Sequence, residues 1–271
     1  MAPVSLDMTG KAVLVTGGTK GVGRGIAERF LEAGAEVVVC GRNQPQQPIE
    51  AGGKTALFVA ADVRDVDQSA ALIDTAVTKL GRLDVLVNNA GGAPPADAAT
   101  ASPRFSEAII RLNLIAPLDL AQKANAIMQE QEHGGVIVNI ASVSALRPSP
   151  GTAAYGAAKA GLLSLTQSLA VEWAPKVRVN AITAGMIRTE QAELHYGDAT
   201  GIARVEATVP LGRLGDPADV GDACVFLASP LARYISGASL LVHGGGERPA
   251  FLAAANAPGA QSTAPAKKKK P

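Results

Sequence analysis

Short apolar runs alternate with longer amphipathic segments along most of this 271-residue chain. Seven runs are rich in Val, Ile and Leu, and they read KAVLVTGG, EVVVC, LFVAADV, LDVLVNNAGG, VIVNIAS, VRVNAI and ASLLVHGG. Short runs without polar alternation are typical of parallel strands that are buried on both faces. The pattern therefore predicts a parallel sheet of about seven strands.

The segments between these runs have the spacing of helices. Apolar residues recur every three or four positions in TKGVGRGIAERFLEAGA, VDQSAALIDTAVTKL, the stretch from about Arg104 to Gln131, and DPADVGDACVFLAS. Helices that connect parallel strands form right-handed crossovers and cover both faces of the sheet. We therefore predict an α/β fold with a single doubly wound sheet of the Rossmann type.

The periodic pattern weakens at two places. Residues 249–271 are rich in Ala and Pro and end in four lysines, which is typical of a flexible tail. Residues 1–248 have a suitable length for one α/β domain. Within that domain, the segment from Ala184 to Gly215 has little periodicity, and we expect it to be mobile.

Composition and charge narrow the possible classes of protein. Hydrophobic residues make up 47% of the chain, which is enough for a large buried core. The formal charge of +1 includes the four terminal lysines; without them, the chain has 21 basic and 24 acidic residues. A nucleic-acid-binding surface is therefore not expected. Cys40 and Cys224 are too few for a disulfide framework, and the three histidines lack metal-ligand spacing. No apolar stretch has the length of a signal core or membrane span, so we expect a cytoplasmic protein without metal or membrane partners.

Candidate chemistry begins with Tyr155 and Lys159, which lie four residues apart and therefore on one face of a helix. An ammonium ion about 4 Å from a phenol contributes roughly 4 kcal/mol in a partly screened site. This would lower the pKa of the phenol by about two to three units and make Tyr155 an acid or base near neutral pH. Ser142 ends a buried run, and we expect its hydroxyl to bind a substrate oxygen.

A glycine-rich turn provides a second candidate site. Gly17, Gly21 and Gly23 lie between the first strand and its helix, where backbone amides and the helix dipole can hold a pyrophosphate. The second strand ends at Arg42 without a carboxylate for the hydroxyls of an adenosine ribose. We expect Lys20 and Arg42 to bind a 2′-phosphate there, which favours NADP. If both are ordinary surface cations, NAD is the alternative.

Together these motifs resemble the short-chain dehydrogenase/reductase family over about residues 9–246. The matching pieces are TGGTKGVG, the Asp62-Val63 pair, the NNAG ending at Gly91, Asn113 in RLNLIAP, Ser142, Tyr155-x-x-x-Lys159, VRVNAI and Ile187-Arg-Thr189. The resemblance implies a dinucleotide-binding and catalytic domain over 1–248. It also implies hydride transfer between NAD(P) and a small carbonyl or alcohol substrate, and a homo-oligomer, commonly a homotetramer.

The resemblance further implies a role for each matching residue. Ser142 would orient and polarise the substrate oxygen, and Tyr155 would deliver or remove its proton. Lys159 would hold the nicotinamide ribose, and Asn113 would support a water that replaces the proton. With Lys20 and Arg42, the expected cofactor contacts are Gly17, Thr19, Gly21, Val22, Gly23, Asp62, Val63, Asn89, Ala90, Gly91, Tyr155, Lys159, Ile187 and Thr189.

Two departures from the family pattern leave the substrate pocket open. Ala184-Gly185 stands where the family usually has Pro-Gly, and His243 stands where an Asp often precedes the Gly pair. The functions under consideration are an NADP(H)-dependent oxidoreductase of ketones and secondary alcohols, an NAD-dependent hydroxyacyl or alcohol dehydrogenase or 3-oxoacyl thioester reductase, and a non-catalytic nucleotide-binding sensor. Arg147 could meet an anionic substrate, although a surface cation is the preferred interpretation.

Overall fold

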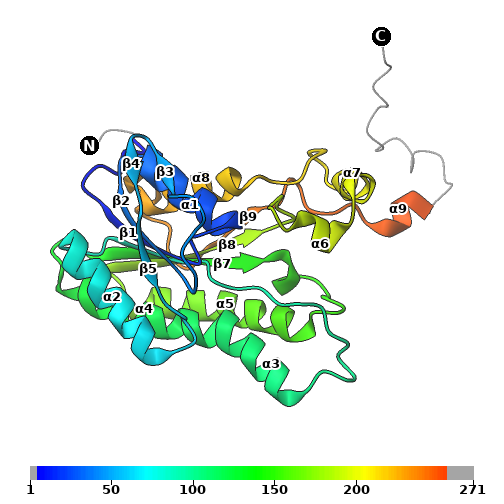
Figure 1. Ribbon diagram of the computed structural model, residues 1–271, viewed down its shortest axis with the longest axis horizontal. Coiled ribbons are helices and arrows are strands. Elements are labelled where there is room, and N and C mark those ends of the chain that lie inside the picture. Colours follow the sequence, from blue (N-terminus) through cyan, green and yellow to red (C-terminus); the bar gives the residue numbers. More distant parts are fainter. Residues whose placement is uncertain (1–4, 255–271) are drawn as a thin grey trace, which may run out of the picture.

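The seven apolar runs become seven strands of one parallel sheet in the computed structural model, which describes residues 5–254 (Figure 1). The strand order is β5-β2-β1-β6-β7-β8-β9, so the chain starts in the middle of the sheet and builds outward in both directions. A crevice at the carboxyl ends of β1 and β6 is therefore expected. The strands are β1 (Ala12–Thr16), β2 (Glu36–Gly41), β5 (Leu57–Ala60), β6 (Val85–Asn88), β7 (Gly135–Ser142), β8 (Val177–Ala184) and β9 (Ser239–Val242).

Helices cover both faces of this sheet, as the alternating pattern predicts (Figure 1). One face packs on α1 and α8, and the other packs on α2, α4 and α5. Adjacent residues of β1 divide between these two cores, because Val13 belongs to the first and Leu14 to the second. The helices are α1 (Gly21–Glu32), α2 (Val66–Leu80), α3 (Pro103–Ile110), α4 (Ala116–Glu130), α5 (Ala153–Glu172) and α8 (Pro217–Ala228).

Two glycines let α1 and α8 approach each other closely. A Cβ atom on Gly25 would lie 2.3 Å from Cβ of Pro217, and one on Gly221 would lie 2.6 Å from Cγ of Arg29. Neither distance leaves room for a methyl group. This contact holds the amino end of α8 against α1 and thereby fixes the chain that leads into α8.

The structure contains several short elements that the sequence pattern did not predict. An antiparallel pair joins β3 (Glu50–Ala51) and β4 (Lys54–Thr55) beside α1. The segment expected to be mobile contains α6 (Ala192–Tyr196) and α7 (Ala199–Glu206), and the predicted tail begins with α9 (Ala250–Ala254). Residues 255–271 of that tail lie outside the described part of the chain. The 3-10 turns are η2 (Val143–Ala145) and η3 (Pro230–Ala232).

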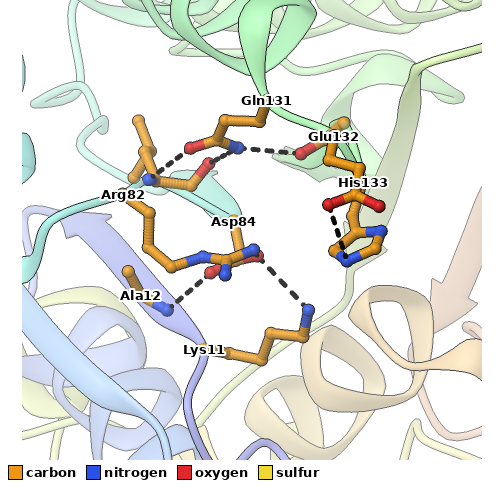
Figure 2. A network of polar contacts seen from close by, with 9 residues as sticks. Lys11, Ala12, Arg82, Asp84, Gln131, Glu132 and His133 are labelled. Carbon is orange, nitrogen blue, oxygen red and sulfur yellow. Dashed lines mark hydrogen bonds and ion pairs between the residues drawn. The ribbon is translucent and has the colours of Figure 1, made fainter.

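The amino ends of β1 and β6 are joined by a polar cluster around Asp84 (Figure 2). Its carboxylate, which is 7% exposed, accepts hydrogen bonds from the Ala12 amide at 2.9 Å, Lys11 Nζ at 3.3 Å and an Arg82 guanidinium nitrogen at 2.6 Å. Two cations therefore compensate one buried carboxylate. No helix within residues 5–254 is both long and apolar enough to span a bilayer.

Candidate active site

The predicted reacting residues come together at the carboxyl ends of β7 and β8. Ser142 is the last residue of β7, and Tyr155 and Lys159 both lie in the first two turns of α5. Lys159 Nζ lies 5.7 Å from the centre of the Tyr155 ring, as expected for residues four apart on one helix face. The spacing argument from the sequence therefore places these two side chains correctly.

Lys159 is buried, and its ammonium group donates a hydrogen bond to the Ile140 carbonyl oxygen at 2.8 Å. Burial disfavours the charged form and lowers the pKa of Lys159 to about 8. The strand that ends in Ser142 thus also fixes the position of the lysine. An ammonium group with this pKa is still mostly protonated at neutral pH.

The pKa of Tyr155 is raised above its ordinary value, which contradicts the lowering expected from Lys159. Burial is the largest cause, the Ser142 hydroxyl opposes it, and the nearby Tyr196 phenol adds a smaller increase. The attraction by Lys159, calculated from Coulomb's law, left out the cost of removing a phenolate from water. Here that cost is larger than the attraction, so the pKa rises. In this structure Tyr155 is therefore a protonated phenol at neutral pH.

Asn113 lies in a π-helical turn, η1 (Arg111–Ile115), that joins α3 to α4 and divides the long helix expected there. Its buried side-chain amide donates to the carbonyl oxygens of Gly92 and Ile109, both at 2.9 Å. Its carbonyl oxygen accepts a hydrogen bond from the Gly92 amide at 2.8 Å. Such π-turns often occur at functional sites. Here the turn aims Asn113 at the loop that follows β6.

Gly91 lies directly between Asn113 and Lys159. A Cβ atom at this position would be 2.6 Å from Asn113 Oδ1 and 3.2 Å from Lys159 Nζ. The loop after β6 therefore passes close to both side chains because residue 91 has none. All four predicted catalytic residues and Gly91 thus belong to one connected site.

The glycine-rich turn between β1 and α1 is packed against the end of β6. Asn89 donates from its side-chain amide to the carbonyl oxygens of Thr16 at 2.8 Å and Gly17 at 3.2 Å. A Cβ atom on Gly23 would lie 2.2 Å from the Gly17 oxygen, and Ala90 donates its amide to Thr16 Oγ1 at 3.0 Å. Asn89, which the family resemblance places along a cofactor ribose, thus also supports the glycine-rich turn.

The first turn of α1 accepts an anion in this structure. Gly17 and Gly21 have φ angles of +62° and +53°, in the left-handed region where glycine is favoured. The Gly21 amide donates to Glu190 Oε1 at 3.0 Å. Val22 and Gly23 continue the helix from there. A carboxylate on a helix amino terminus stands where a pyrophosphate would bind, so these residues fit a dinucleotide.

The end of the site where an adenosine is expected has two exposed cations, Lys20 and Arg42, and one carboxylate that is already hydrogen-bonded, Asp62. Lys20 precedes α1 and Arg42 follows β2, and neither forms an ion pair within residues 5–254. Asp62 accepts hydrogen bonds from Arg64 at 2.9 and 2.5 Å, and this contact is the main reason that the pKa of Asp62 is lowered. Val63 is buried beside it.

The segment after β8 extends from the end of β9 to the start of α1. Ile187 forms a parallel bridge to Gly215, and a Cβ atom on Gly21 would lie 3.4 Å from Thr189 Cγ2. A Cβ atom on Gly185 would lie 2.6 Å from Cβ of His243. The two departures noted in the sequence, Ala184-Gly185 and His243, are therefore neighbours, because Gly185 packs against His243.

Sequence reasoning missed the contacts that surround the mouth of the site. Arg147 is paired with Glu247, which accepts two hydrogen bonds from its guanidinium group at 2.9 and 2.6 Å. Tyr196 is partly buried, and after burial the Glu247 carboxylate is the main cause that raises its pKa. These residues are 100 and 51 positions apart along the chain, and no local motif signals their proximity.

A small cavity of about 150 Å³ lies beside Tyr155. Short side chains line most of it, with Phe105 and Ile109 of α3 forming an apolar wall. The lining also includes Ala96, Ala101 and Ala154. This cavity offers apolar space next to the phenol but contains no charged group.

Comparison with known proteins places this architecture among oxidoreductases. A family model described as enoyl-(acyl carrier protein) reductase matches residues 17–247. The chain is 39% identical to an L-rhamnose 1-dehydrogenase (NAD(P)(+)) of Azotobacter vinelandii, covering 87% of this chain and 96% of that protein. It is 34% identical to a 2-dehydro-3-deoxy-D-gluconate 5-dehydrogenase of Escherichia coli, with 89% and 97% covered.

Solved structures of dehydrogenases have the same fold as this chain. A putative short-chain alcohol dehydrogenase from Sinorhizobium meliloti superposes with a TM-score of 0.82 at 37% identity, covering 90% of this chain and 98% of that one. A ligand-free aldohexose dehydrogenase from Thermoplasma acidophilum superposes with a TM-score of 0.81 at 33% identity, covering 89% and 94%. These similarities extend over nearly the whole of each protein.

Proposed function

The chain belongs to the short-chain dehydrogenase/reductase family, and we propose that it is an NADP(H)-dependent oxidoreductase that interconverts a ketone and a secondary alcohol. The family acts on CH–OH and C=O groups with NAD(P). The observation that carries the proposal is the convergence of Ser142, Tyr155 and Lys159 beside Asn113. These residues and the glycine-rich turn all lie within 1–248, which we propose as one dinucleotide-binding and catalytic domain.

Tyr155 would transfer the proton. When bound, the nicotinamide cofactor supplies or accepts the hydride. Ser142 would donate a hydrogen bond that orients the substrate carbonyl. Because the raised pKa keeps Tyr155 protonated at neutral pH, the phenol would donate its proton to the substrate oxygen during reduction. In the oxidative direction the proton would return to the phenolate.

Lys159 and Asn113 would support this transfer. The Lys159 ammonium group lies close enough to the Tyr155 ring to stabilise the phenolate as it forms. Its bond to Ile140 fixes it near the end of β7, where it would also hold the nicotinamide ribose. Asn113, whose amide is bound to Gly92 and Ile109, would hold the loop beside Lys159 and support a water that replaces the proton.

Lys20 and Arg42 support NADP over NAD as the cofactor. Both are exposed at the adjacent ends of β1 and β2, where an adenosine 2′-phosphate would lie, and no carboxylate stands at the end of β2. An acidic substitution at Gly41 would be a poor test of this preference. A Cβ atom there would lie 2.9 Å from the Thr19 side chain. Substitutions of Arg42 avoid that collision.

The surroundings of Tyr155 favour a neutral substrate. Because Arg147 is already engaged by Glu247, it offers no free positive charge to a carboxylate or an acyl thioester. Two of the similar proteins are named for dehydrogenation of neutral sugars, L-rhamnose and aldohexoses. We therefore propose a small hydroxylated carbonyl compound or its alcohol as substrate.

A homo-oligomer, such as a tetramer, is part of the proposal. The small residues Ala153, Ala157 and Ala160 of α5 are exposed on one side of the helix that carries Tyr155. Such a surface allows a second helix to approach closely. Light scattering of the purified protein measures its mass in solution, and a monomer would contradict this part.

The decisive experiment is a substrate screen combined with a matched pair of variants. Neutral sugars, polyols and ketones are supplied with NADP⁺ or NADPH, and the absorbance of the reduced nicotinamide is followed. Tyr155→Phe should lower the turnover rate by about 10²–10⁴-fold while the Kd of the cofactor stays nearly unchanged. Tyr234→Phe, at a fully exposed position, should leave both unchanged. A Tyr155→Phe variant with more than a tenth of the wild-type rate would refute the role of Tyr155.

A further inference from the structure

The carboxylate of Glu190 lies on the backbone amide that begins α1. Glu190 Oε1 accepts a hydrogen bond from the Gly21 amide at 3.0 Å, although the two residues are 169 positions apart. A Cβ atom on Gly21 would also lie 3.9 Å from Glu190 Oε2. Both carboxylate oxygens therefore face the first residue of the helix that follows the glycine-rich turn.

The backbone around Glu190 is held in a defined position. Residues 186–188 pair with Gly215: the Arg188 amide donates to the Gly215 oxygen at 2.7 Å, and the Gly215 amide donates to the Met186 oxygen at 2.9 Å. Gly215 in turn leads into α8, which packs closely on α1 through Gly25 and Pro217. The contact between Glu190 and Gly21 is thus supported at both of its ends by packed structure.

The positive amino end of α1 favours a carboxylate such as that of Glu190. The first turn of α1 contains no acidic residue, so its unpaired amides and positive dipole end have no negative side chain of their own helix nearby. Glu190 provides that negative charge from another part of the chain. A pyrophosphate would use the same amide for the same reason.

We propose that Glu190 is an intramolecular competitor of the cofactor pyrophosphate and thereby sets cofactor affinity. This inference rests on the proposed cofactor site at the glycine-rich turn. On cofactor binding, the pyrophosphate would replace the Glu190 carboxylate at the Gly21 amide. The displaced carboxylate would then lie near the negatively charged pyrophosphate, which repels it. Because Glu190 directly follows Thr189, the exchange would also release the start of the segment that leads into α6, on the substrate side.

Removal of the Glu190 charge should therefore tighten cofactor binding. We expect Glu190→Ala to lower the Kd of NADPH, measured by fluorescence titration, by about two- to fivefold, because a carboxylate at an exposed helix amino end contributes an effect of this size. Glu190→Gln should give a smaller decrease, since its amide oxygen can still accept the Gly21 hydrogen bond. Glu193→Gln is the matched control, because Glu193 is an exposed acid of the same segment in α6.

A second readout separates displacement of the pyrophosphate from other causes. NADH contains the same pyrophosphate but lacks the 2′-phosphate, so its Kd should fall by the same factor in Glu190→Ala. An unchanged or increased Kd in Glu190→Ala, an equal decrease in Glu193→Gln, or a change confined to NADPH would overturn the inference. If the wild-type protein bound neither cofactor, both the proposed function and the inference on Glu190 would fail. Wild-type binding with unaltered affinity in the variants would overturn this inference alone.

Discussion

Replacement of Gly91 by alanine adds one methyl group next to both Asn113 and Lys159. The new Cβ atom would lie 2.6 Å from Asn113 Oδ1, whereas a carbon–oxygen contact is ordinarily at least about 3.3 Å. One of the two groups must therefore move by roughly 0.7 Å. The distance of 3.2 Å to Lys159 Nζ is also short, so the backbone cannot simply move toward the lysine.

The magnitude follows from how firmly Asn113 is held. Three hydrogen bonds of 2.8 to 2.9 Å, two with Gly92 and one with Ile109, resist its displacement. Overpacking of this kind costs about 1–3 kcal/mol of stability. A misplacement of about 1 Å at a reacting group costs about 100-fold in rate. We therefore expect Gly91→Ala to lower kcat about 10- to 100-fold, with a modest decrease in the free energy of unfolding.

The assay compares steady-state kinetics and denaturant unfolding of Gly91→Ala with those of Gly161→Ala. A Cβ atom on Gly161, within α5, would meet only the flexible end of Leu114, at 3.1 Å. That control should retain nearly full activity. Wild-type kcat in Gly91→Ala would refute the reasoning, because it would mean that the close packing of Gly91 on Asn113 and Lys159 does not affect the reaction.

Three further predictions concern charge. NADPH should be preferred over NADH at least about tenfold in kcat/KM, equivalent to about 1.4 kcal/mol, and Arg42→Ala should remove most of this preference; equal use of both cofactors by the wild type would contradict it. Asp84→Ala leaves the buried Ala12 amide unpaired and should cost about 1–3 kcal/mol in urea unfolding without changing kcat; an unchanged midpoint would refute this. Burial lowers the pKa of Lys159 from 10.5 to about 8. Between these two pH values the unfolded chain holds more protons than the folded one, so the free energy of unfolding rises with pH. Lys159→Met should remove that rise and be inactive, yet be more stable at pH 7 by up to about 3 kcal/mol; a less stable variant would contradict the burial cost.

The sheet and its two helical layers could be predicted from the sequence because their signals are local. Each strand is a short apolar run, and the division of Val13 and Leu14 between two cores follows from strand geometry alone. The spacing of Tyr155 and Lys159 is likewise a property of one helix. The glycine-rich turn could be placed because it directly follows the first strand.

The electrostatics of the site could not be predicted in the same way. The pKa of Tyr155 depends on burial by distant segments, and this reverses the direction expected from its helical neighbour. The contacts of Glu190 with Gly21 and of Arg147 with Glu247 join positions 169 and 100 residues apart. No local pattern marks such pairs, because each member alone is indistinguishable from a surface charge.

The π-helical turn at Arg111–Ile115 has a consequence for how this chain tolerates changes in length. A turn of this kind contains one residue more than a regular α-helix would need, and each residue of an α-helix advances it by about 100°. Deletion of a single residue there would give a regular, uninterrupted helix from α3 to α4. It would also rotate α3 about its axis relative to the loop after β6, so that Asn113 no longer met Gly92. The extra residue therefore sets the rotation of the helix about its axis. With this rotation the apolar face of the helix packs on the sheet while the side-chain amide of Asn113 points to the reaction site.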